Sequence, residues 1–212
     1  MKINYFKLIE STGAVNSGHF VLTSGRHIGR YINKDFVSAY PRILDSLAKT
    51  VAKNFRSFKV DVVASSATGA IVFGNRVAEH LGRGINSIYT EQIDNKFVFR
   101  RNYSKFVKPK TRVLIIDDIV TTGRTTRSMI KAVKNLGGVV VGIGLIWDGG
   151  AYDFGIPVFA CVTDKFEHFN EKACPFCKER TEIDTKINKH GTKFIKEYGK
   201  NPSNWPANRK KL

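Results

Sequence analysis

Residues 113–126 read VLIIDDIVTTGRTT and carry the strongest signal in this chain. The first four, residues 113–116, are apolar and predict a short buried strand. Two carboxylates, Asp117 and Asp118, come at the carboxyl end of that strand, and a loop of hydroxyl residues around Gly123 follows. Backbone N–H groups in such a loop, with a helix behind them, form a cradle for an anion. The stretch therefore predicts a strand–loop–helix unit that binds a ligand.

Strands and helices are predicted to alternate along the chain. The short apolar runs expected to form strands are residues 60–64, 85–89, 113–116, 139–146 and 157–162. The helices expected between them are residues 41–55, 70–81 and 125–136, the last with a hydroxyl residue as its cap and Gly137 just past its end. This order predicts an α/β fold with a central parallel sheet flanked by helices. In such sheets ligands bind at the carboxyl ends of the strands.

The chemistry of this stretch fits a ribose 5-phosphate. The hydroxyl and N–H groups of residues 121–126 suit a terminal phosphate. Asp117 and Asp118 suit either two ribose hydroxyls or the shell of a Mg²⁺ ion. The simpler interpretation is a Rossmann-like turn with incidental acids. A P-loop is excluded, because the nearest pattern, at residues 69–76, lacks the required Lys and Ser/Thr.

Composition limits the class of protein. The chain has 212 residues, of which 42% are hydrophobic and 25% charged, which is enough apolar material for a domain with a core. No apolar run approaches the ~18 residues that cross a bilayer, and residues 1–10 lack the apolar segment of a signal peptide. Three cysteines cannot all pair, which favours a reducing compartment. We therefore expect a cytoplasmic protein without a membrane partner.

The net charge is strongly positive. Lys and Arg number 35 against 18 Asp and Glu, which gives +17. Such a charge attracts nucleic acid, anionic lipid or a polyanionic small substrate, and it does not choose among them. Residues 178–212 hold ten basic and four acidic residues, so we expect a basic C-terminal extension there. Nucleic-acid binding through this extension is an alternative that we do not favour, because no helix-turn-helix or zinc-finger pattern is present.

Three stretches together resemble a known family. Residues 113–126 resemble the 5-phosphoribosyl 1-diphosphate (PRPP) motif of type I phosphoribosyltransferases. Residues 18–27, GHFVLTSGRH, are similar to the N-terminal signature of orotate phosphoribosyltransferases, and residues 174–177, CPFC, are similar to a run in one bacterial and archaeal branch. The resemblance implies a Rossmann-like domain over residues 1–177, with a core at 41–165 and a small hood made by the terminal parts, its N-terminal portion at 1–40.

The resemblance also implies an activity and its residues. The chain would transfer phosphoribosyl from PRPP to a nucleobase with release of diphosphate, the base being orotate in pyrimidine biosynthesis. The PRPP-binding residues implied are Ala67, Thr68, Gly69, Asp117, Asp118, Ile119, Val120, Thr121, Thr122, Gly123, Arg124, Thr125 and Thr126. Mg²⁺ would be bound mainly through PRPP, without protein ligands of its own.

A mobile catalytic loop is implied at residues 91–105. It typically reaches the active site of the neighbouring subunit, so the resemblance implies a homodimer with shared active sites. The catalytic residues implied are Asp117, Asp118, Lys96, Arg100, Arg101 and Lys105. Without the accompanying motifs, residues 91–105 would be interpreted as a solvated hairpin.

The base-binding end departs from the family pattern. Orotate enzymes of this type carry an Arg for the orotate carboxylate where this chain has Gly149, and usually a Gly where it has Arg124. The base-binding candidates are Thr121, Arg26 and Gly149. Either Arg26 compensates for the missing Arg or the base is not orotate. Two further functions stay open on the same fold: a PRPP-sensing regulator that binds nucleic acid, and a degenerate relative that consumes PRPP.

Cys174 and Cys177 have the spacing of half a structural zinc site, which Cys161 and His168 could complete. Because the chain has no second Cys pair, we expect reduced thiols in preference to zinc. The two histidines within residues 18–27 are expected to pack or form hydrogen bonds rather than act as catalysts.

Overall fold

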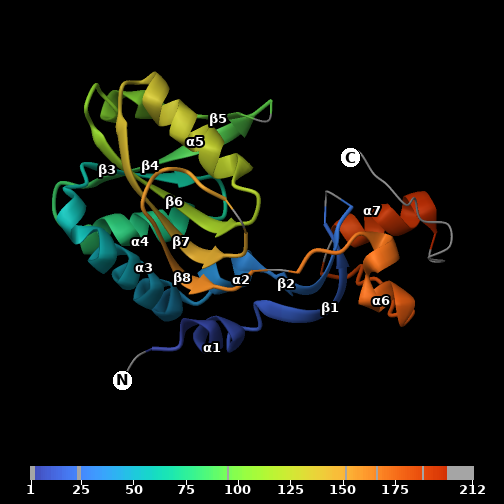
Figure 1. The fold of residues 1–212 in the computed structure, drawn as a ribbon. Coiled ribbons are helices and arrows are strands. Elements are labelled where there is room, and N and C mark those ends of the chain that lie inside the picture. Colours follow the sequence, from blue (N-terminus) through green and yellow to red (C-terminus); the bar gives the residue numbers. More distant parts are fainter. Residues whose placement is uncertain are drawn as a thin grey trace. The chain divides into compact units, whose positions relative to one another are not determined.

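The computed structural model of the chain (Figure 1) describes residues 3–22, 25–94, 96–150, 152–165, 167–187 and 189–199. The chain divides into two compact units. The first comprises Met1–Thr12 and Lys34–Lys165, and the second comprises Gly13–Asn33 and Phe166–Leu212. Each unit is therefore built from two separate segments of the chain. Among the described residues, no helix has the length and apolar character of a membrane span.

A six-stranded sheet forms the centre of the first unit. Its strands are β3 (Val62–Ser66), β4 (Asn86–Ile93), β5 (Lys96–Val98), β6 (Arg112–Val120), β7 (Val139–Asp148) and β8 (Val158–Thr163). They lie in the order β5-β4-β3-β6-β7-β8, and every neighbouring pair is parallel except the β4–β5 hairpin. The predicted parallel sheet is confirmed. Strand β5 was not predicted, because three residues are too few to show a period.

Helices cover both faces of this sheet (Figure 1). The longer ones are α3 (Pro41–Phe55), α4 (Ile71–Leu81) and α5 (Arg124–Asn135). Helices α3 and α4 pack together on one face, and α5 lies on the other. All three lie within one residue of their predicted bounds, because a Pro begins α3 and glycines follow α4 and α5. The shorter helices are α1 (Tyr5–Glu10), α2 (Lys34–Ser38) and the 3₁₀ turns Arg56–Phe58 and Tyr103–Phe106.

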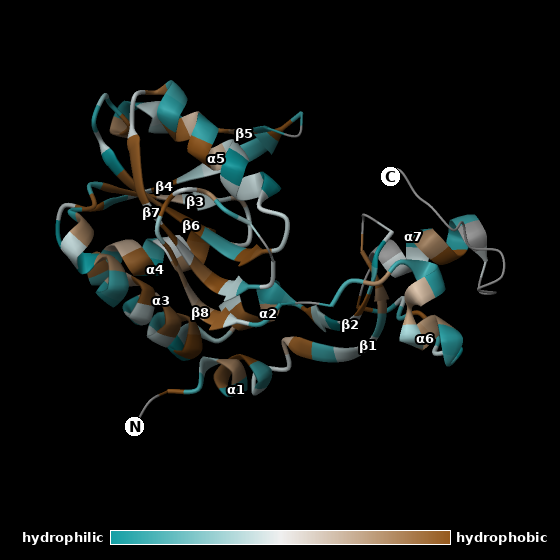
Figure 2. Ribbon diagram, in the orientation of Figure 1, coloured by the Kyte–Doolittle hydropathy of each residue, from teal (hydrophilic) through white to brown (hydrophobic). Residues whose placement is uncertain are grey.

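Strand β7 shows how the two faces are filled. A Cβ on Gly142 would lie 2.3 Å from Phe55 Cε1 of α3, and a Cβ on Gly144 would lie 2.5 Å from Val51 Cγ1. Ile143, between them, is buried in the cluster that includes the apolar side chains of α5. Glycine on one face therefore lets α3 approach the strand backbone, while large side chains on the other face contact α5. In Figure 2 the strands of the sheet are mainly hydrophobic, and α3 carries both hydrophobic and hydrophilic residues.

Strand β6 continues four residues beyond its predicted end at Ile116. Strand β7 is one residue longer than β6 and pairs with it, with Asp117 opposite Leu145 and Val120 opposite Asp148. The predicted boundary was wrong because two charged residues in sequence usually indicate the end of a strand. Here the backbone of β7 continues beside them, and β6 stays paired with it.

The start of α5 differs from the prediction of a hydroxyl cap. The N-cap is Gly123, in the left-handed region with φ +72°, and no side chain caps the helix. The Thr126 hydroxyl instead donates to Asp117 Oδ2 at 3.1 Å. The hydroxyl residues of this loop are therefore available for contacts other than helix capping.

The second unit is small. It contains the antiparallel strands β1 (Val15–Val21) and β2 (His27–Ile32), the 3₁₀ turn Glu171–Ala173, α6 (Pro175–Lys178) and α7 (Lys189–Tyr198). Backbone bridges join His19 to Ile183 and His27 to Phe169. A cluster of buried apolar residues lies beside them: Val21, Ile183 and Phe194.

The C-terminal extension expected from Lys178 onward begins inside α6. Up to residue 199, its described part belongs to the second unit, where Phe194 of α7 packs with Val21 of β1. Residues 200–212 lie outside the described residues.

Candidate active site

Two loops emerge together at the carboxyl edge of the central sheet. From β3 the chain continues to β4 on one side, and from β6 it continues to β7 on the other, although β3 and β6 are neighbours. Such a divergence point is where α/β sheets bind ligands. The loop at 67–70 follows β3, and the loop at 121–123 follows β6. Both contain residues that the family resemblance implies for PRPP binding.

Asp117 is held by three hydrogen bonds. Its Oδ1 accepts from Ser66 Oγ at 2.6 Å and from the backbone N–H of Asp118 at 3.0 Å, and its Oδ2 accepts from Thr126 Oγ1. Burial, followed by the charge of Asp118, raises the pKa of Asp117 to about 7, although the hydrogen bonds act in the opposite direction. One carboxyl group thus joins β3, β6 and α5.

Asp118 pairs with a lysine that the sequence analysis missed. Lys34 Nζ lies 2.7 Å from Asp118 Oδ2, and the N–H of Ile119 donates to Oδ1 at 2.6 Å. The Asp118 side chain is 4% exposed and that of Lys34 is 45% exposed, so a buried carboxylate meets a cation that reaches in from the surface. Burial lowers the pKa of Lys34, but the charges of Asp118 and Asp117 outweigh it and raise that pKa. No motif marks Lys34, because only the fold brings α2 to β6.

The loop after β3 approaches the carboxylates closely. A Cβ on Gly69 would lie 2.0 Å from Asp118 Oδ2 and 3.0 Å from Lys34 Nζ, so only glycine fits. The peptide bond between Ala67 and Thr68 is cis. Thr68 is exposed. Three elements therefore meet at Asp118: the strand β6, the loop after β3 and the first residue of α2.

The predicted PRPP-binding stretch divides between strand, loop and helix. Ile119 and Val120 belong to β6, residues 121–123 form the loop, and Arg124 begins α5. Thr122 and Arg124 are exposed, Thr121 and Thr125 are half-buried, and Thr126 is buried. The first N–H groups of α5 have no partners within the helix, and they offer an anion site beside these hydroxyls.

Aromatic residues cover the loop from one side. A Cβ on Gly123 would lie 2.8 Å from Phe154 Cζ, and Phe154 stacks on Tyr152 with ring centroids 4.4 Å apart. Arg127 lies over the Phe154 ring and donates from Nη1 to the carbonyl of Thr122. The loop is thus fixed by contacts that leave its exposed hydroxyls accessible.

The predicted catalytic cations lie on the β4–β5 hairpin and the turn after it. Lys96, Arg100, Arg101 and Lys105 are all exposed. Arg101 Nε donates to Glu91 Oε1 of β4 at 2.6 Å. The hairpin form that the sequence offered as the alternative is present, and Arg101 contacts Glu91 rather than the Asp117–Asp118 pair.

The base-binding candidates belong to different units of the chain. Gly149 follows β7 directly and is buried, and its N–H donates to the carbonyl of Val120 at 2.9 Å. A Cβ on Gly150 would lie 1.7 Å from the carbonyl oxygen of Thr121, so this turn runs directly along the loop. Arg26 is an exposed residue of the second unit.

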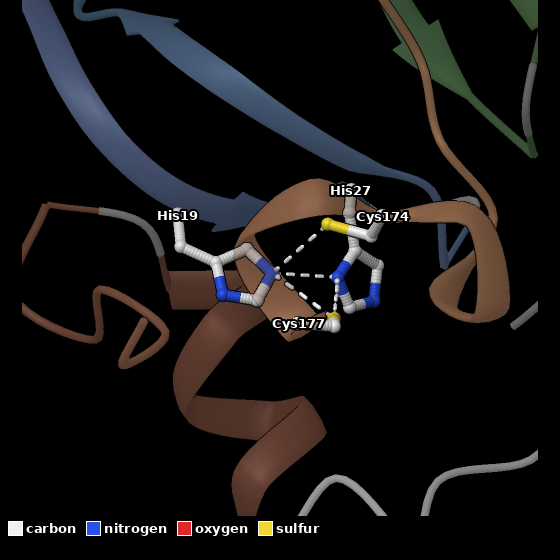
Figure 3. A group of neighbouring side chains, drawn as sticks. All are labelled: His19, His27, Cys174 and Cys177. Carbon is white, nitrogen blue, oxygen red and sulfur yellow. Dashed lines mark hydrogen bonds between the residues drawn. The ribbon is translucent and has the colours of Figure 1, made fainter. Parts of the chain in front are cut away.

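The second unit holds a different constellation (Figure 3). Four side chains gather there: His19, His27, Cys174 and Cys177. The predicted completion by Cys161 and His168 is wrong. Cys161 lies on β8 of the first unit, where its Sγ donates to the carbonyl of Leu47, and His168 is exposed. Spacing could not reveal the two histidines, because 155 residues separate His19 from Cys174.

The histidines hydrogen-bond to each other, as expected, with 2.7 Å between His19 Nε2 and His27 Nδ1. Burial, followed by the charge of His19, lowers the pKa of His27 to about 4. Burial also lowers the pKa of His19, although its hydrogen bond to the backbone at Thr181 acts in the opposite direction. Both imidazoles are therefore neutral at physiological pH, the form in which histidine binds metals.

Comparisons with known proteins agree with this geometry. Residues 35–174 match the model of the phosphoribosyl transferase domain. The orotate phosphoribosyltransferase of Caldanaerobacter subterraneus subsp. tengcongensis is 32% identical over 180 residues, 84% of this chain and 93% of that protein. The enzyme of the same name from Pelotomaculum thermopropionicum is 35% identical over 174 residues, 81% of this chain and 90% of that protein.

A solved structure shares the fold. The crystal structure of orotate phosphoribosyltransferase from Aeropyrum pernix aligns with a TM-score of 0.60 at 23% identity, over 74% of this chain and 92% of that chain. The matched domain includes both loops and the carboxylate pair between them. This chain belongs to the phosphoribosyl transferase family.

Proposed function

We propose that this chain transfers the 5-phosphoribosyl group of PRPP to orotate, which yields orotidine 5′-monophosphate and diphosphate. The observation that carries the proposal is the Asp117–Asp118 pair, which lies beside Gly69 of one anion-binding loop and Thr126 at the end of the other. The names and the high coverage of the relatives support orotate as the base.

Each element has a role in the proposed reaction. Residues 121–126 hold the 5-phosphate through N–H and hydroxyl groups. A carboxylate has about four acceptor sites, and three of those of Asp117 accept hydrogen bonds within the protein. Asp117 therefore holds the end of β6 in place and keeps one acceptor site for a ribose hydroxyl. Asp118 accepts from a second ribose hydroxyl. Lys34 then faces the diphosphate beside Gly69.

The chemistry is electrostatic. The bond between the anomeric carbon and diphosphate breaks, positive charge develops on the ribose, and the base nitrogen forms the new bond as its proton passes to solvent. Asp118 stabilises the ribose end, and Lys34 stabilises the leaving group. No strong general base is required.

Mg²⁺ fits this site as a partner of the substrate. Asp118 Oδ2 contacts Lys34, and Asp117 is engaged by three donors, so neither carboxylate offers a ready pair of ligand oxygens. We propose that oxygens of PRPP supply most of its ligands. When bound, the ion neutralises charge on the leaving diphosphate.

We further propose that the hairpin acts across a homodimer. Lys96, Arg100, Arg101 and Lys105 are exposed cations, and a diphosphate leaving group gives such cations a function. Arg101 would leave Glu91 for the diphosphate of the partner's site.

A second candidate substrate is a nucleobase without a carboxylate. Gly149 and Gly150 supply no cation at the end of β7, and their N–H groups are engaged by Val120 and Asp148. An unpaired substrate carboxylate is costly in a site that lacks its partner. Orotate would therefore need a cation from elsewhere in the chain, and Arg26 is the candidate that the sequence offers.

The deciding experiment measures diphosphate release from PRPP with orotate, uracil, nicotinate, adenine and hypoxanthine, each with and without Mg²⁺. Orotate should support release, and chromatography should detect orotidine 5′-monophosphate. If diphosphate is released with another base but not with orotate, that base replaces orotate as the proposed substrate. Absence of release with every base would refute the transferase proposal.

A further inference from the structure

The cluster in the second unit has the composition of a metal site. His19 on β1, His27 on β2, and Cys174 and Cys177 at α6 each offer one ligand atom, and these atoms all lie within 4.8 Å of one another. The first three residues are at most 1% exposed, and Cys177 is half-buried. Figure 3 shows the imidazoles and thiols directed toward a common point.

Three sulfur–nitrogen distances are close to those of a tetrahedral site. His19 Nε2 lies 3.7 Å from Cys174 Sγ and 3.6 Å from Cys177 Sγ, and His27 Nδ1 lies 3.3 Å from Cys177 Sγ. Zinc bonds of about 2.3 Å to sulfur and about 2.0 Å to nitrogen give sulfur–nitrogen edges of about 3.6 Å. The 2.7 Å between the two nitrogens is a hydrogen bond. A bound ion would replace that hydrogen bond, and the distance between the two nitrogens would increase by roughly 0.6 Å.

The surroundings orient one ligand in advance. His19 Nδ1 contacts the carbonyl of Thr181 at 2.8 Å. A carbonyl only accepts, so Nδ1 carries the proton and the Nε2 lone pair points into the cluster. Metal-binding histidines are commonly fixed in this way by a second hydrogen bond. Backbone bonds also hold the main chain: Asp184 N–H donates to the His19 carbonyl, and His27 and Phe169 exchange two hydrogen bonds.

We propose that His19, His27, Cys174 and Cys177 bind one Zn²⁺ ion in a closed structural site. Binding displaces the thiol protons of Cys174 and Cys177 to solvent, moves the imidazole proton of His27 from Nδ1 to Nε2, and forms two Zn–S and two Zn–N bonds. Two thiolates cancel the charge of the ion, so the buried site is neutral. Four protein ligands leave no position for substrate, and the role is therefore structural rather than catalytic.

The second unit has a physical need for such a link. One cluster of buried apolar side chains in it comprises Val21, Ile183 and Phe194, with Cys177 and Ile195 against it, and Phe20, Ile28 and Ile32 are buried as well. Units this small rarely gain enough free energy from apolar burial alone. The ion would bind the β1–β2 hairpin to the C-terminal segment, and its binding energy would contribute to folding of the unit.

The test begins with metal content. The full chain, purified without chelator or a metal-affinity tag, is analysed for zinc and iron by mass spectrometry. We expect about one zinc per chain and little iron. Cys177→Ser and His27→Asn should each reduce bound zinc at least about tenfold. Cys161→Ser and His168→Asn are the matched controls, since they remove the same groups outside the cluster, and both should retain zinc.

A second measurement needs no variant. The wild-type chain, stripped with chelator and reconstituted with Co²⁺, should show the intense visible bands of tetrahedral cobalt and a thiolate charge-transfer band, both lost on adding excess zinc. Chelation should also lower the thermal midpoint. A chain without zinc and without these bands overturns the proposal, as does stoichiometric iron with sulfide or a Cys174–Cys177 disulfide in the purified chain.

Discussion

Lys34 Nζ lies 2.7 Å from Asp118 Oδ2, and that same oxygen occupies the space that a side chain at Gly69 would need. The three residues come from α2, β6 and the loop after β3. The candidate site therefore has a cation, a hydrogen-bond acceptor and a backbone segment without a side chain close together.

Asp118→Asn should lower kcat for diphosphate release by about 100-fold or more, because the amide removes negative charge where the ribose becomes positive. KM for PRPP should change much less. Asp61→Asn is the matched control: Asp61 also accepts a backbone N–H, from Arg112, but lies at the opposite edge of the sheet. Unchanged kcat in Asp118→Asn would remove this residue from the catalytic set.

Lys34→Met should raise KM for PRPP by roughly tenfold, because a cation near the diphosphate is lost while the aliphatic stem is kept. The variant should also unfold at a lower temperature without substrate, since it leaves a buried carboxylate without its ion-pair partner. Lys34→Arg should recover part of the affinity. Steady-state kinetics and a thermal melt measure both effects. An unaltered KM would restrict Lys34 to a stabilising role.

Gly69→Ala should abolish most activity, because the new methyl group would overlap Asp118 Oδ2 and displace Lys34. Gly84→Ala is the comparison. Gly84 has a positive φ and open space around it, so its substitution costs about 1 kcal/mol of backbone strain without a clash. Comparable activity in the two variants would contradict the close approach of this loop.

The stability of the substrate-free chain should fall as the pH rises from 4 to 7. An unfolded Asp loses its proton near pH 3.9, whereas burial holds the pKa of Asp117 at about 7. The folded state binds the extra proton between these values, so raising the pH removes stability. Asp117→Asn should lessen this loss by about 2 to 4 kcal/mol. Denaturant titrations at pH 5 and 8 measure it, with Asp61→Asn as the control that keeps the wild-type slope.

Mixing two inactive variants tests the shared site. Asp118→Asn lacks the ribose contact, and Arg100→Ala combined with Arg101→Ala lacks the hairpin cations. If the hairpin acts across a dimer, equal mixing after dissociation should restore about a quarter of wild-type activity, because half of the dimers carry one complete site. No recovery would show that each chain uses its own hairpin.

The parallel sheet and its main helices could be predicted because their signals are local. In α3, Pro41 begins the helix, and Leu44, Leu47, Val51 and Phe55 form one buried stripe. Asp117 and Asp118 were recognisable because charged residues directly after a buried run are unusual.

Lys34 and the two histidines could not be predicted because their partners are remote in sequence. Asp118 is 84 residues from Lys34, and only the fold brings the two together. The spacing of Cys174 and Cys177 indicated two of the four cluster residues. The pairing of the strands that hold His19 and His27 with the C-terminal segment has no periodic pattern in the sequence.

The second unit joins residues 13–33 to residues from 166 onward, with about 130 residues of the first unit between them. A ribosome adds roughly 5–20 residues per second, so on the order of ten seconds separates the synthesis of these two segments. The nascent β1–β2 hairpin therefore emerges long before α6 and α7, while the sheet of the first unit is complete once β8 has left the exit tunnel. The second unit is consequently completed later than the first.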